Sequence, residues 1–222
     1  MTNVNVDEAY NKQADDYDRF IVKLIPDYLR FNALIPRLAA KPGTVLDIGC
    51  GTGNTSARIL EAYPKAKLTC IDPSPAMIGI ARRKLGDSVT FMESPVEAFQ
   101  TEERFDLAVS VMVMHNIQTT ARRQEVYEKI YSALNPGGAY VSVDIFKGEC
   151  DLSQKLFMKY WRDFMLESMP MDEVDGKWLA LYKEKDKPLK MSEQLAMLKK
   201  AGFSSVDIIH KAMNFALILA LK

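Results

Sequence analysis

The chain has 222 residues, of which 48% are hydrophobic, so it is long enough to bury one sizeable core and one domain is expected. A formal net charge of +0 and a pI of about 6.7 argue against a nucleic-acid partner, which usually requires a basic domain. The three cysteines, Cys50, Cys70 and Cys150, form no C-x-x-C pair, so neither a disulfide framework nor a metal site is expected. The amino terminus has no signal-like core, and no apolar run approaches the ~20 residues that cross a bilayer, which predicts a cytoplasmic protein without a membrane partner.

The amino-terminal segment, residues 1–40, is expected to be helical. Within residues 7–19, Tyr10 and Tyr17 fall two helical turns apart and share one face. Two interpretations stay open: the tyrosines dock this helix on the body of the protein, or the helix forms a lid over a bound cofactor. A second helix is predicted over residues 27–40, where a proline precedes an apolar stripe.

A short apolar strand followed by three alternate glycines is the most informative stretch. Residues 45–48 predict a buried strand, and Gly49, Gly51 and Gly53 follow before a predicted helix. Side chains at these positions would fill space that a closely bound ligand needs. The order G-x-G-x-G differs from the G-x-G-x-x-G that binds a pyrophosphate, because Asn54 replaces the third glycine. The turn therefore favours a nucleoside without a phosphate chain and disfavours a dinucleotide-dependent dehydrogenase.

A second strand, predicted over residues 67–72, ends in an acid. Asp72 follows the turn by roughly 20 residues, the separation of the ribose-binding acid in nucleotide-binding folds. Its carboxylate can accept both hydrogens of a vicinal diol. The next helix does not need this acid as a cap, because Ser74 and Pro75 already supply an N-cap and a proline at the first helical position. We therefore predict that Asp72 binds a ligand.

Three more strands alternate with helices further along the chain. They are predicted over residues 88–93, 105–117, where the chain leaves into a polar turn, and 139–146. An amphipathic helix is predicted over residues 120–134. Five strands that alternate with helices predict a parallel, doubly wound sheet.

His115 stands in the polar turn after the fourth predicted strand. An unperturbed imidazole has a pKa near ~6.5, so it can remove a proton from a substrate. A histidine in such a turn also commonly bonds the backbone of its own loop, and both interpretations stay open. His210 falls in a late strand, so no histidine-rich metal site is expected.

Residues 151–190 interrupt the alternation and are rich in methionine and aromatic side chains. They predict a helical insert that packs on the core, forms a homodimer, or lines a pocket for an apolar or aromatic substrate. A helix over residues 192–201 follows. The apolar runs 203–210 and 214–221 then predict an antiparallel hairpin that completes the sheet.

These motifs resemble those of the class I S-adenosylmethionine-dependent methyltransferases. Their first motif is similar to residues 47–53, and their turn before the fifth strand is similar to the Asn-Pro-Gly-Gly at 135–138. The resemblance covers nearly the whole chain. It implies a Rossmann-like, doubly wound, mostly parallel seven-stranded sheet with a carboxyl-terminal antiparallel hairpin, and S-adenosyl-L-methionine as cofactor. Residues 1–222 would form a single methyltransferase domain with a helical lid (1–40) and a helical insert (151–190).

Within this family the chain looks most like the carboxy-S-adenosylmethionine synthase branch. The similar stretches are residues 25–28, 71–77, 127–138, 200–203 and 214–215. The resemblance implies that the cofactor is bound by Tyr28, Gly49, Cys50, Gly51, Asp72, Pro73, Pro95, Val96 and Ser110.

The adenine corner departs from the family pattern. Where the family usually carries Gly-Asp, this chain has Ser94 and Pro95. Proline cannot accept a bond from the adenine amino group through a side chain, so recognition is expected from the backbone near Val96 or from Glu97.

The synthase branch also uses an arginine in its insert to hold the carboxylate that it installs. Here no arginine follows Arg162, and Leu179 stands at the matching place. Lys177 is near, but a point-charge ammonium does not replace a bidentate guanidinium. Gly51 also follows the ordinary methyltransferase pattern, whereas that branch tends to have serine.

We therefore predict a methyltransferase that moves a methyl group by in-line displacement to a small-molecule acceptor. The cofactor carries its own leaving group, so the protein mainly aligns the nucleophile and excludes water. Tyr17 and His115 are the candidate catalytic residues. The alternatives are a carboxy-S-adenosylmethionine synthase-like enzyme acting in tRNA wobble uridine modification, and a non-catalytic S-adenosylmethionine-binding protein.

Overall fold

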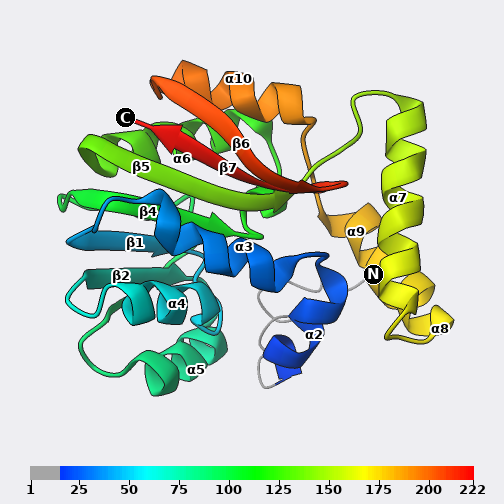
Figure 1. The fold of residues 1–222 in the computed structure, drawn as a ribbon, viewed down its shortest axis with the longest axis horizontal. Coiled ribbons are helices and arrows are strands. Elements are labelled where there is room, and N and C mark those ends of the chain that lie inside the picture. The colour runs from blue at the N-terminus through cyan, green and yellow to red at the C-terminus, as the bar shows by residue number, and fades with distance from the viewer. Residues whose placement is uncertain (1–15) are drawn as a thin grey trace.

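A computed structural model describes residues 16–222 of the chain (Figure 1). Most of the helix predicted over residues 7–19, Tyr10 included, lies outside this range, and Tyr17 begins helix α2 (Tyr17–Leu24). The described residues form a seven-stranded sheet in the order β3-β2-β1-β4-β5-β7-β6. None of their helices combines the length and the apolar character needed to cross a bilayer.

The first five strands are parallel, as the alternation of strands and helices predicts. Their bounds are β1 (Thr44–Ile48), β2 (Lys67–Asp72), β3 (Thr90–Glu93), β4 (Phe105–Val111) and β5 (Leu134–Ile145). Successive side chains point to opposite faces of the sheet: Val45 and Leu107 belong to one buried cluster, Leu46 and Ala108 to the other. Both faces are therefore covered, which confirms the doubly wound α/β fold.

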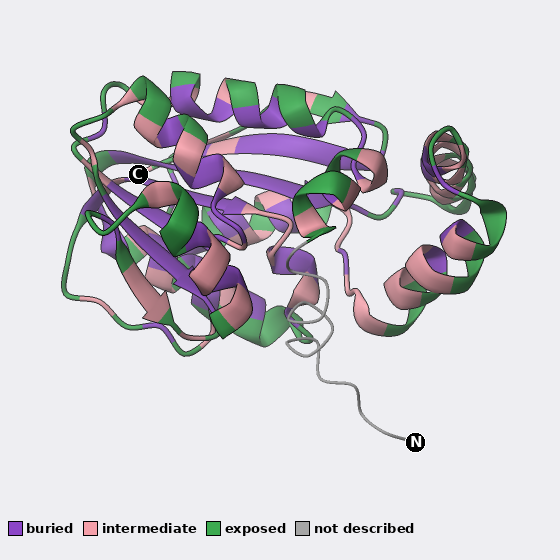
Figure 2. Ribbon diagram, turned by 90° about the horizontal axis from the view of Figure 1, so that it is seen from below, coloured by how far each residue is buried: buried purple, intermediate pink, exposed green. Residues whose placement is uncertain are grey.

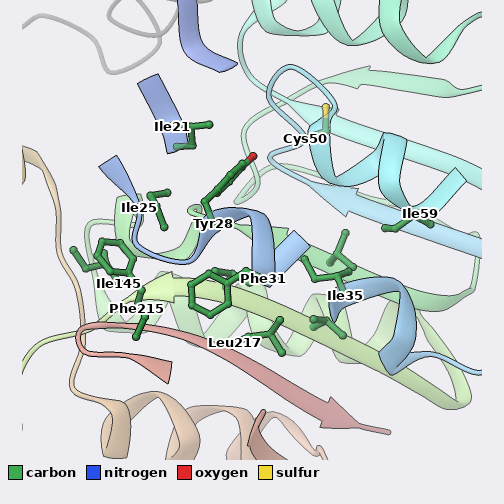
Figure 3. Packing of buried hydrophobic residues seen from close by; sticks show 14 of the residues in the cluster. Ile21, Ile25, Tyr28, Phe31, Ile35, Cys50, Ile59, Ile145, Phe215 and Leu217 are labelled. Atoms are coloured by element: carbon green, nitrogen blue, oxygen red, sulfur yellow. The ribbon is translucent and has the colours of Figure 1, made fainter. Parts of the chain in front are cut away.

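Helices cover the two faces of the sheet. One face carries α3 (Tyr28–Leu34) and α4 (Asn54–Ala62), and the other carries α6 (Thr120–Ala133) and α10 (Met191–Ala201) (Figure 1). On the first face, Phe31 packs with residues of β7 in a continuous apolar layer (Figure 3). The exposed residues gather on the outer sides of the helices, and the strands between them are mostly buried (Figure 2).

The predicted N-cap of the helix after β2 is confirmed. The backbone N–H of Met77 donates to the Ser74 hydroxyl at 3.1 Å, Pro75 is the first residue of α5 (Pro75–Leu85), and Gly86 ends that helix.

Two predicted elements end earlier than expected. The helix predicted over residues 27–40 is α3 followed by a 3-10 helix, η2 (Ile35–Leu38), because Pro36 has no N–H with which to continue the α-helical hydrogen bonding. The strand predicted over residues 105–117 ends at Val111, since Met112 has a φ of 60° that no strand tolerates. A 3-10 helix, η3 (Met114–Asn116), follows and carries His115.

The fifth strand starts earlier than residue 139, where the sequence predicted it. Leu134 already pairs with Phe105, and the register then shifts before Ala139 pairs with Leu107. The Asn-Pro-Gly-Gly turn at 135–138 therefore lies inside β5 as an irregularity.

The insert is helical, as predicted. It consists of α7 (Asp151–Leu166), α8 (Met171–Glu173), the π-helix η4 (Val174–Trp178) and α9 (Leu179–Lys185). These helices stand at the end of the sheet where β5 finishes, apart from the layers on its two faces (Figure 1). The predicted hairpin is confirmed as β6 (Ser205–Ala212) and β7 (Phe215–Leu221), with β7 antiparallel to both β5 and β6.

Candidate functional site

A first cavity of about 270 Å³ opens where the parallel strands β1 to β4 end. The strand order reverses beside β1, and open α/β sheets bind ligands at such a switch point, outside the carboxyl ends of the strands. Six residues that the sequence predicts to bind the cofactor line this cavity: Gly49, Gly51, Asp72, Pro73, Pro95 and Val96.

The glycine turn after β1 has left-handed backbone at the positions that need it. Gly49 has a φ of 66°, and a Cβ there would lie 2.4 Å from Cγ2 of Val113. Gly51 has a φ of 54°, but a Cβ there would meet no heavy atom within 4 Å. Gly49 therefore allows the turn to pack on Val113, whereas Gly51 leaves open space beside the cavity.

Asp72 fastens this turn to the end of β2. Its Oδ2 accepts a hydrogen bond from the Gly51 N–H at 2.8 Å, and its Oδ1 accepts one from the Ser74 N–H at 2.9 Å. A carboxylate oxygen can accept more than one hydrogen bond. The acid is thus able to hold the turn and still accept from a diol, and the sequence indicated only the second of these roles.

A second cavity of about 90 Å³ adjoins the first, because Tyr17 and Met112 line both. Its remaining walls come from α2 and the segment after it, from the end of β5, from η3 and from the insert. They consist of Phe20, Ile21, Leu24, Ile25, His115, Ile145, Trp161, Trp178, Leu181, Tyr182 and Asp186. The lining formed by residues 16–222 is mostly aliphatic and aromatic, and it contains neither lysine nor arginine.

The insert and α2 are joined across this second cavity. The indole N–H of Trp161 donates to the carbonyl oxygen of Leu24 at 2.6 Å, although 137 positions separate the two residues. The Phe20 and Trp178 rings lie 6.2 Å apart between centroids, and the Lys177 ammonium lies 5.5 Å from the Phe20 ring centroid. Aromatic contacts thus connect α2 with the π-helix of the insert.

His115 is 4% exposed and bonds a carboxylate rather than the backbone of its loop. Its Nδ1 lies 2.6 Å from Oδ1 of Asp144 in β5, and its backbone N–H donates to Oδ2 of the same residue at 3.1 Å. Burial disfavours the charged imidazole, but the negative charge of Asp144 and the hydrogen bond to it outweigh burial and raise the pKa of His115.

Three predicted cofactor residues lie outside the lining of both cavities. The Tyr28 hydroxyl accepts a hydrogen bond from Nδ2 of Asn54 at 3.3 Å, and burial raises the pKa of this phenol. Ser110 bonds the Tyr140 hydroxyl at 2.7 Å. Cys50 is buried, and a hydrogen bond to Cys70 together with burial raises the pKa of its thiol. Cofactor contact by these three residues stays a prediction.

Three residues of this region were not predicted from the sequence: Met112, Asp144 and Asp186. Asp144 had a signal, because a carboxyl in an otherwise apolar strand needs a buried partner. Met112 and Asp186 had none that we recognise: one depends on a positive φ, and the other reaches the cavity from the end of α9. Within residues 16–222, His, Cys, Asp and Glu side chains form no group of three that could hold a metal ion.

Known proteins match the part of the chain that forms most of the first cavity. Residues 45–138 match the methyltransferase domain family. The carboxy-S-adenosyl-L-methionine synthase of Campylobacter lari is 28% identical over 217 residues, covering 94% of this chain and 92% of the relative. A malonyl-[acyl-carrier protein] O-methyltransferase of Anoxybacillus flavithermus is 37% identical over 106 residues, covering 46% of this chain and only 39% of the relative.

Solved structures share the fold. The plantazolicin methyltransferase BpumL, in complex with a desmethylPZN analog and SAH, superimposes with a TM-score of 0.69 at 17% identity, covering 98% of this chain and 90% of that one. Human N-acetylserotonin methyltransferase in complex with SAM gives a TM-score of 0.59 at 18% identity, covering 97% of this chain and 55% of that one.

The strand order, the glycine turn at the switch point and these matches identify a class I S-adenosylmethionine-dependent methyltransferase. Residues 45–138 carry the methyltransferase domain, and S-adenosyl-L-methionine is the cofactor. The cavity fits that molecule, because it offers open space beside Gly51 and a carboxylate at the end of β2.

Proposed function

We propose that the first cavity holds S-adenosylmethionine, that the second holds a small-molecule acceptor, and that the methyl group passes between them beside Tyr17 and Met112. The observation that carries this proposal is that two cavities of different character share these two residues. Displacement at a sulfonium requires the nucleophile, the methyl carbon and the sulfur in line. Two adjoining cavities set that alignment by binding each partner separately.

The cofactor would lie along the carboxyl ends of the strands. Asp72 would accept hydrogen bonds from the ribose hydroxyls, while the turn from Gly49 to Gly51 approaches the adenosyl group through its backbone. The adenine would lie against Pro95 and Val96, with the backbone at Val96 or the side chain of Glu97 bonding its amino group. Both Val96 and Glu97 line the first cavity, which supports this assignment.

Tyr28, Cys50 and Ser110 would act from behind the cavity lining. Tyr28 bonds Asn54 at the start of α4, and Ser110 lies in β4 next to the lining residue Val111. Cys50 lies between the two lining glycines. Cys50 and Ser110 are thus each next in the chain to a residue that lines the cavity, whereas Tyr28 holds the start of α4 through Asn54.

The acceptor is proposed to be a small molecule with an apolar or aromatic body. The aromatic and aliphatic lining of the second cavity supports this, since such walls bind apolar surface. Among the relatives named as methyltransferases is a trans-aconitate 2-methyltransferase of Escherichia coli, 37% identical over 94 residues, covering 42% of this chain and 36% of that one. That name is consistent with a small acceptor.

We further propose one methyltransferase domain in which residues 1–40 form a lid and residues 151–190 complete the acceptor cavity. The hydrogen bond between Trp161 and Leu24 supports a joint role of the two segments. Cytoplasmic location and a homodimer are also part of the proposal. Leu152 and Leu156, which are 68% and 51% exposed on α7, support an apolar contact between copies, and light scattering tests it.

A carboxy-S-adenosylmethionine synthase is the second candidate, favoured by the similarity to the Campylobacter lari enzyme over nearly the whole chain. Against it, Leu179 is 8% exposed and packs in the apolar core at the start of α9. Arg162 forms a two-pronged ion pair with Asp175, in which Nε and Nη2 each bond one carboxylate oxygen. Mass spectrometry of the cofactor that copurifies with the protein tests this candidate, because a carboxylated cofactor would establish it.

Incubation with methyl-labelled S-adenosylmethionine and a cell extract tests the proposed function. Label in the small-molecule fraction is expected, and Tyr17→Ala should reduce it because Tyr17 lines both cavities. Label in RNA or protein would overturn the proposed class of acceptor. Binding of the cofactor without any transfer would favour a non-catalytic S-adenosylmethionine-binding protein.

A further inference from the structure

His115 lines the second cavity, and only one of its two ring nitrogens has a hydrogen-bond partner among residues 16–222. Nδ1 is held by Asp144 at 2.6 Å, and no group among residues 16–222 hydrogen-bonds Nε2. In the neutral imidazole, a carboxylate beside Nδ1 keeps the proton there, so Nε2 carries the free lone pair. Because His115 lines the cavity, this lone pair is available to a bound acceptor.

Three charged groups set the electrostatics around this ring. Asp144 comes from β5, Asp186 from the end of α9, and Arg123 from α6. The guanidinium of Arg123 donates to the carbonyl oxygens of Ile117 and Lys187, at 2.9 and 2.7 Å. The Lys187 backbone N–H donates to the His115 carbonyl oxygen at 2.8 Å.

A proton on this imidazole is stabilised by its surroundings. Asp144 lies in direct contact with Nδ1, and Asp186 shares the cavity wall with the ring, whereas Arg123 is the opposing charge. The single directly bonded partner is a carboxylate, so the ring gains stability when it becomes cationic.

We infer that His115 is the proton acceptor of the methyl transfer, that Asp144 is its positioning residue, and that the atom methylated is the oxygen of a weakly acidic hydroxyl group. The inference rests on the proposed function. In the step, the acceptor oxygen forms a bond to the methyl carbon as the bond from that carbon to sulfur breaks. The sulfur keeps the electron pair and becomes a neutral thioether, and the hydroxyl proton moves to Nε2 of His115.

A hydroxyl group fits this site better than the other common acceptors. A carboxylate is already ionised, needs no base, and would meet Asp186 in a lining without lysine or arginine among residues 16–222. A neutral amine carries its own lone pair and attacks before it loses a proton. A phenol-like hydroxyl has a pKa near ~10, so a base makes it a far better nucleophile at neutral pH.

The first test identifies the atom that carries the methyl group. The protein is incubated with S-adenosylmethionine carrying a ¹³C-methyl group and a small-molecule extract of cells, and the product is examined by NMR, which separates methyl ethers from esters, N-methyl and S-methyl groups. A methyl ether is expected. Any of the other three would overturn the inference and leave the proposed function standing, whereas no transfer at all would overturn both.

The second test separates a proton acceptor from a structural histidine. His115→Gln should lower kcat by about 10²- to 10⁴-fold and leave the affinity for S-adenosylhomocysteine unchanged. In the wild type, kcat should rise with pH through a pKa above the ordinary histidine value, and Asp144→Asn should shift that pKa downward, because it removes the charge that raises it. His210→Gln changes the other histidine, which bonds Asp27, and should preserve the pH profile.

Each of the two variants, His115→Gln and Asp144→Asn, can test the role of His115 if the other fails to fold. If His115→Gln fails to bind S-adenosylhomocysteine, the pH profile of Asp144→Asn decides. An unchanged profile in that variant, or full kcat in a folded His115→Gln, would overturn the role of His115.

Discussion

Oδ2 of Asp72 accepts a hydrogen bond from the Gly51 N–H at 2.8 Å, so the end of β2 fixes the turn that follows β1. The glycine turn and the end of β2, which the sequence assigns to the cofactor, are thereby held together without a bound ligand. A preformed turn loses little conformational freedom when the cofactor binds, which favours affinity.

Asp72→Asn should weaken binding of S-adenosylhomocysteine by about 10- to 100-fold, as expected for loss of hydrogen bonds to a charged group. The amide keeps the shape of the side chain but loses its charge and one acceptor oxygen. Isothermal titration calorimetry measures the change. Asp207→Asn, on the exposed edge strand β6, is the matched control and should bind normally. An equal loss in both variants would contradict a ligand role for Asp72.

The variants Gly49→Ala and Gly51→Ala should differ in effect: the first should mainly lower folding stability, and the second should mainly weaken cofactor binding. Both place a side chain on left-handed backbone, which costs about 1–2 kcal/mol. Only the Cβ of Gly49→Ala also collides with Val113. The free energy of unfolding of this variant, measured in urea, should therefore fall by about 1–3 kcal/mol more than that of Gly51→Ala. Gly51→Ala should instead weaken cofactor binding, because its methyl group enters open space beside the cavity. Equal stability of the two variants would argue against the observed packing of Gly49 on Val113.

Asp47 should make the protein less stable as pH rises. Burial, and to a smaller extent the charge of Asp72, raise the pKa of Asp47 to about 7, while the Ser56 hydroxyl at 2.5 Å partly offsets this. The folded protein therefore holds a proton that the unfolded chain, with a pKa near ~3.9, has released. The associated stability is fully present below pH ~4 and is lost as pH rises through about 7.

Asp47→Asn tests that linkage. The amide oxygen still accepts from Ser56 and carries no charge, so unfolding free energies at pH 5 and pH 8 should differ less than in the wild type, by about 1–3 kcal/mol. Asp87→Asn, an exposed change, should keep the wild-type difference. The same pH dependence in Asp47→Asn would show that another group causes it.

Trp178→Ala should raise KM for the acceptor by about 10-fold or more, because it removes an aromatic wall that would bury apolar surface. Affinity for S-adenosylhomocysteine should stay unchanged, since Trp178 lines the second cavity and not the first. Leu152→Ala, exposed on the neighbouring helix α7, is the control for the insert as a whole. A change in cofactor affinity without a change in KM would place the acceptor elsewhere.

Most of the fold was readable in the sequence because its signals are local. Alternating strands and helices gave the parallel sheet, Ser74 gave a helix start, and the two final apolar runs gave the hairpin. The break of the second helix at Pro36 was not predicted, although a missing N–H is a local property that the sequence shows. The end of β4 was not predicted either, because it depends on the positive φ of Met112.

The cofactor half of the candidate site was predicted from the sequence in more detail than the acceptor half. The glycines and Asp72 form a motif within a short stretch, so their spacing predicts a common location. The acceptor half depends on contacts between distant segments, such as Trp161 with Leu24 across 137 positions. The partner of His115 likewise comes from a neighbouring strand, and only the fold brings Asp144 to its ring.

A crystal structure of the protein with S-adenosylhomocysteine tests the central claim most directly. We expect adenine against Pro95 and Val96, the ribose on Asp72, and the sulfur at the boundary where Tyr17 and Met112 line both cavities. From there a methyl group would point into the second cavity. A sulfur directed away from that boundary, or a ligand bound outside the first cavity, would contradict transfer between the two.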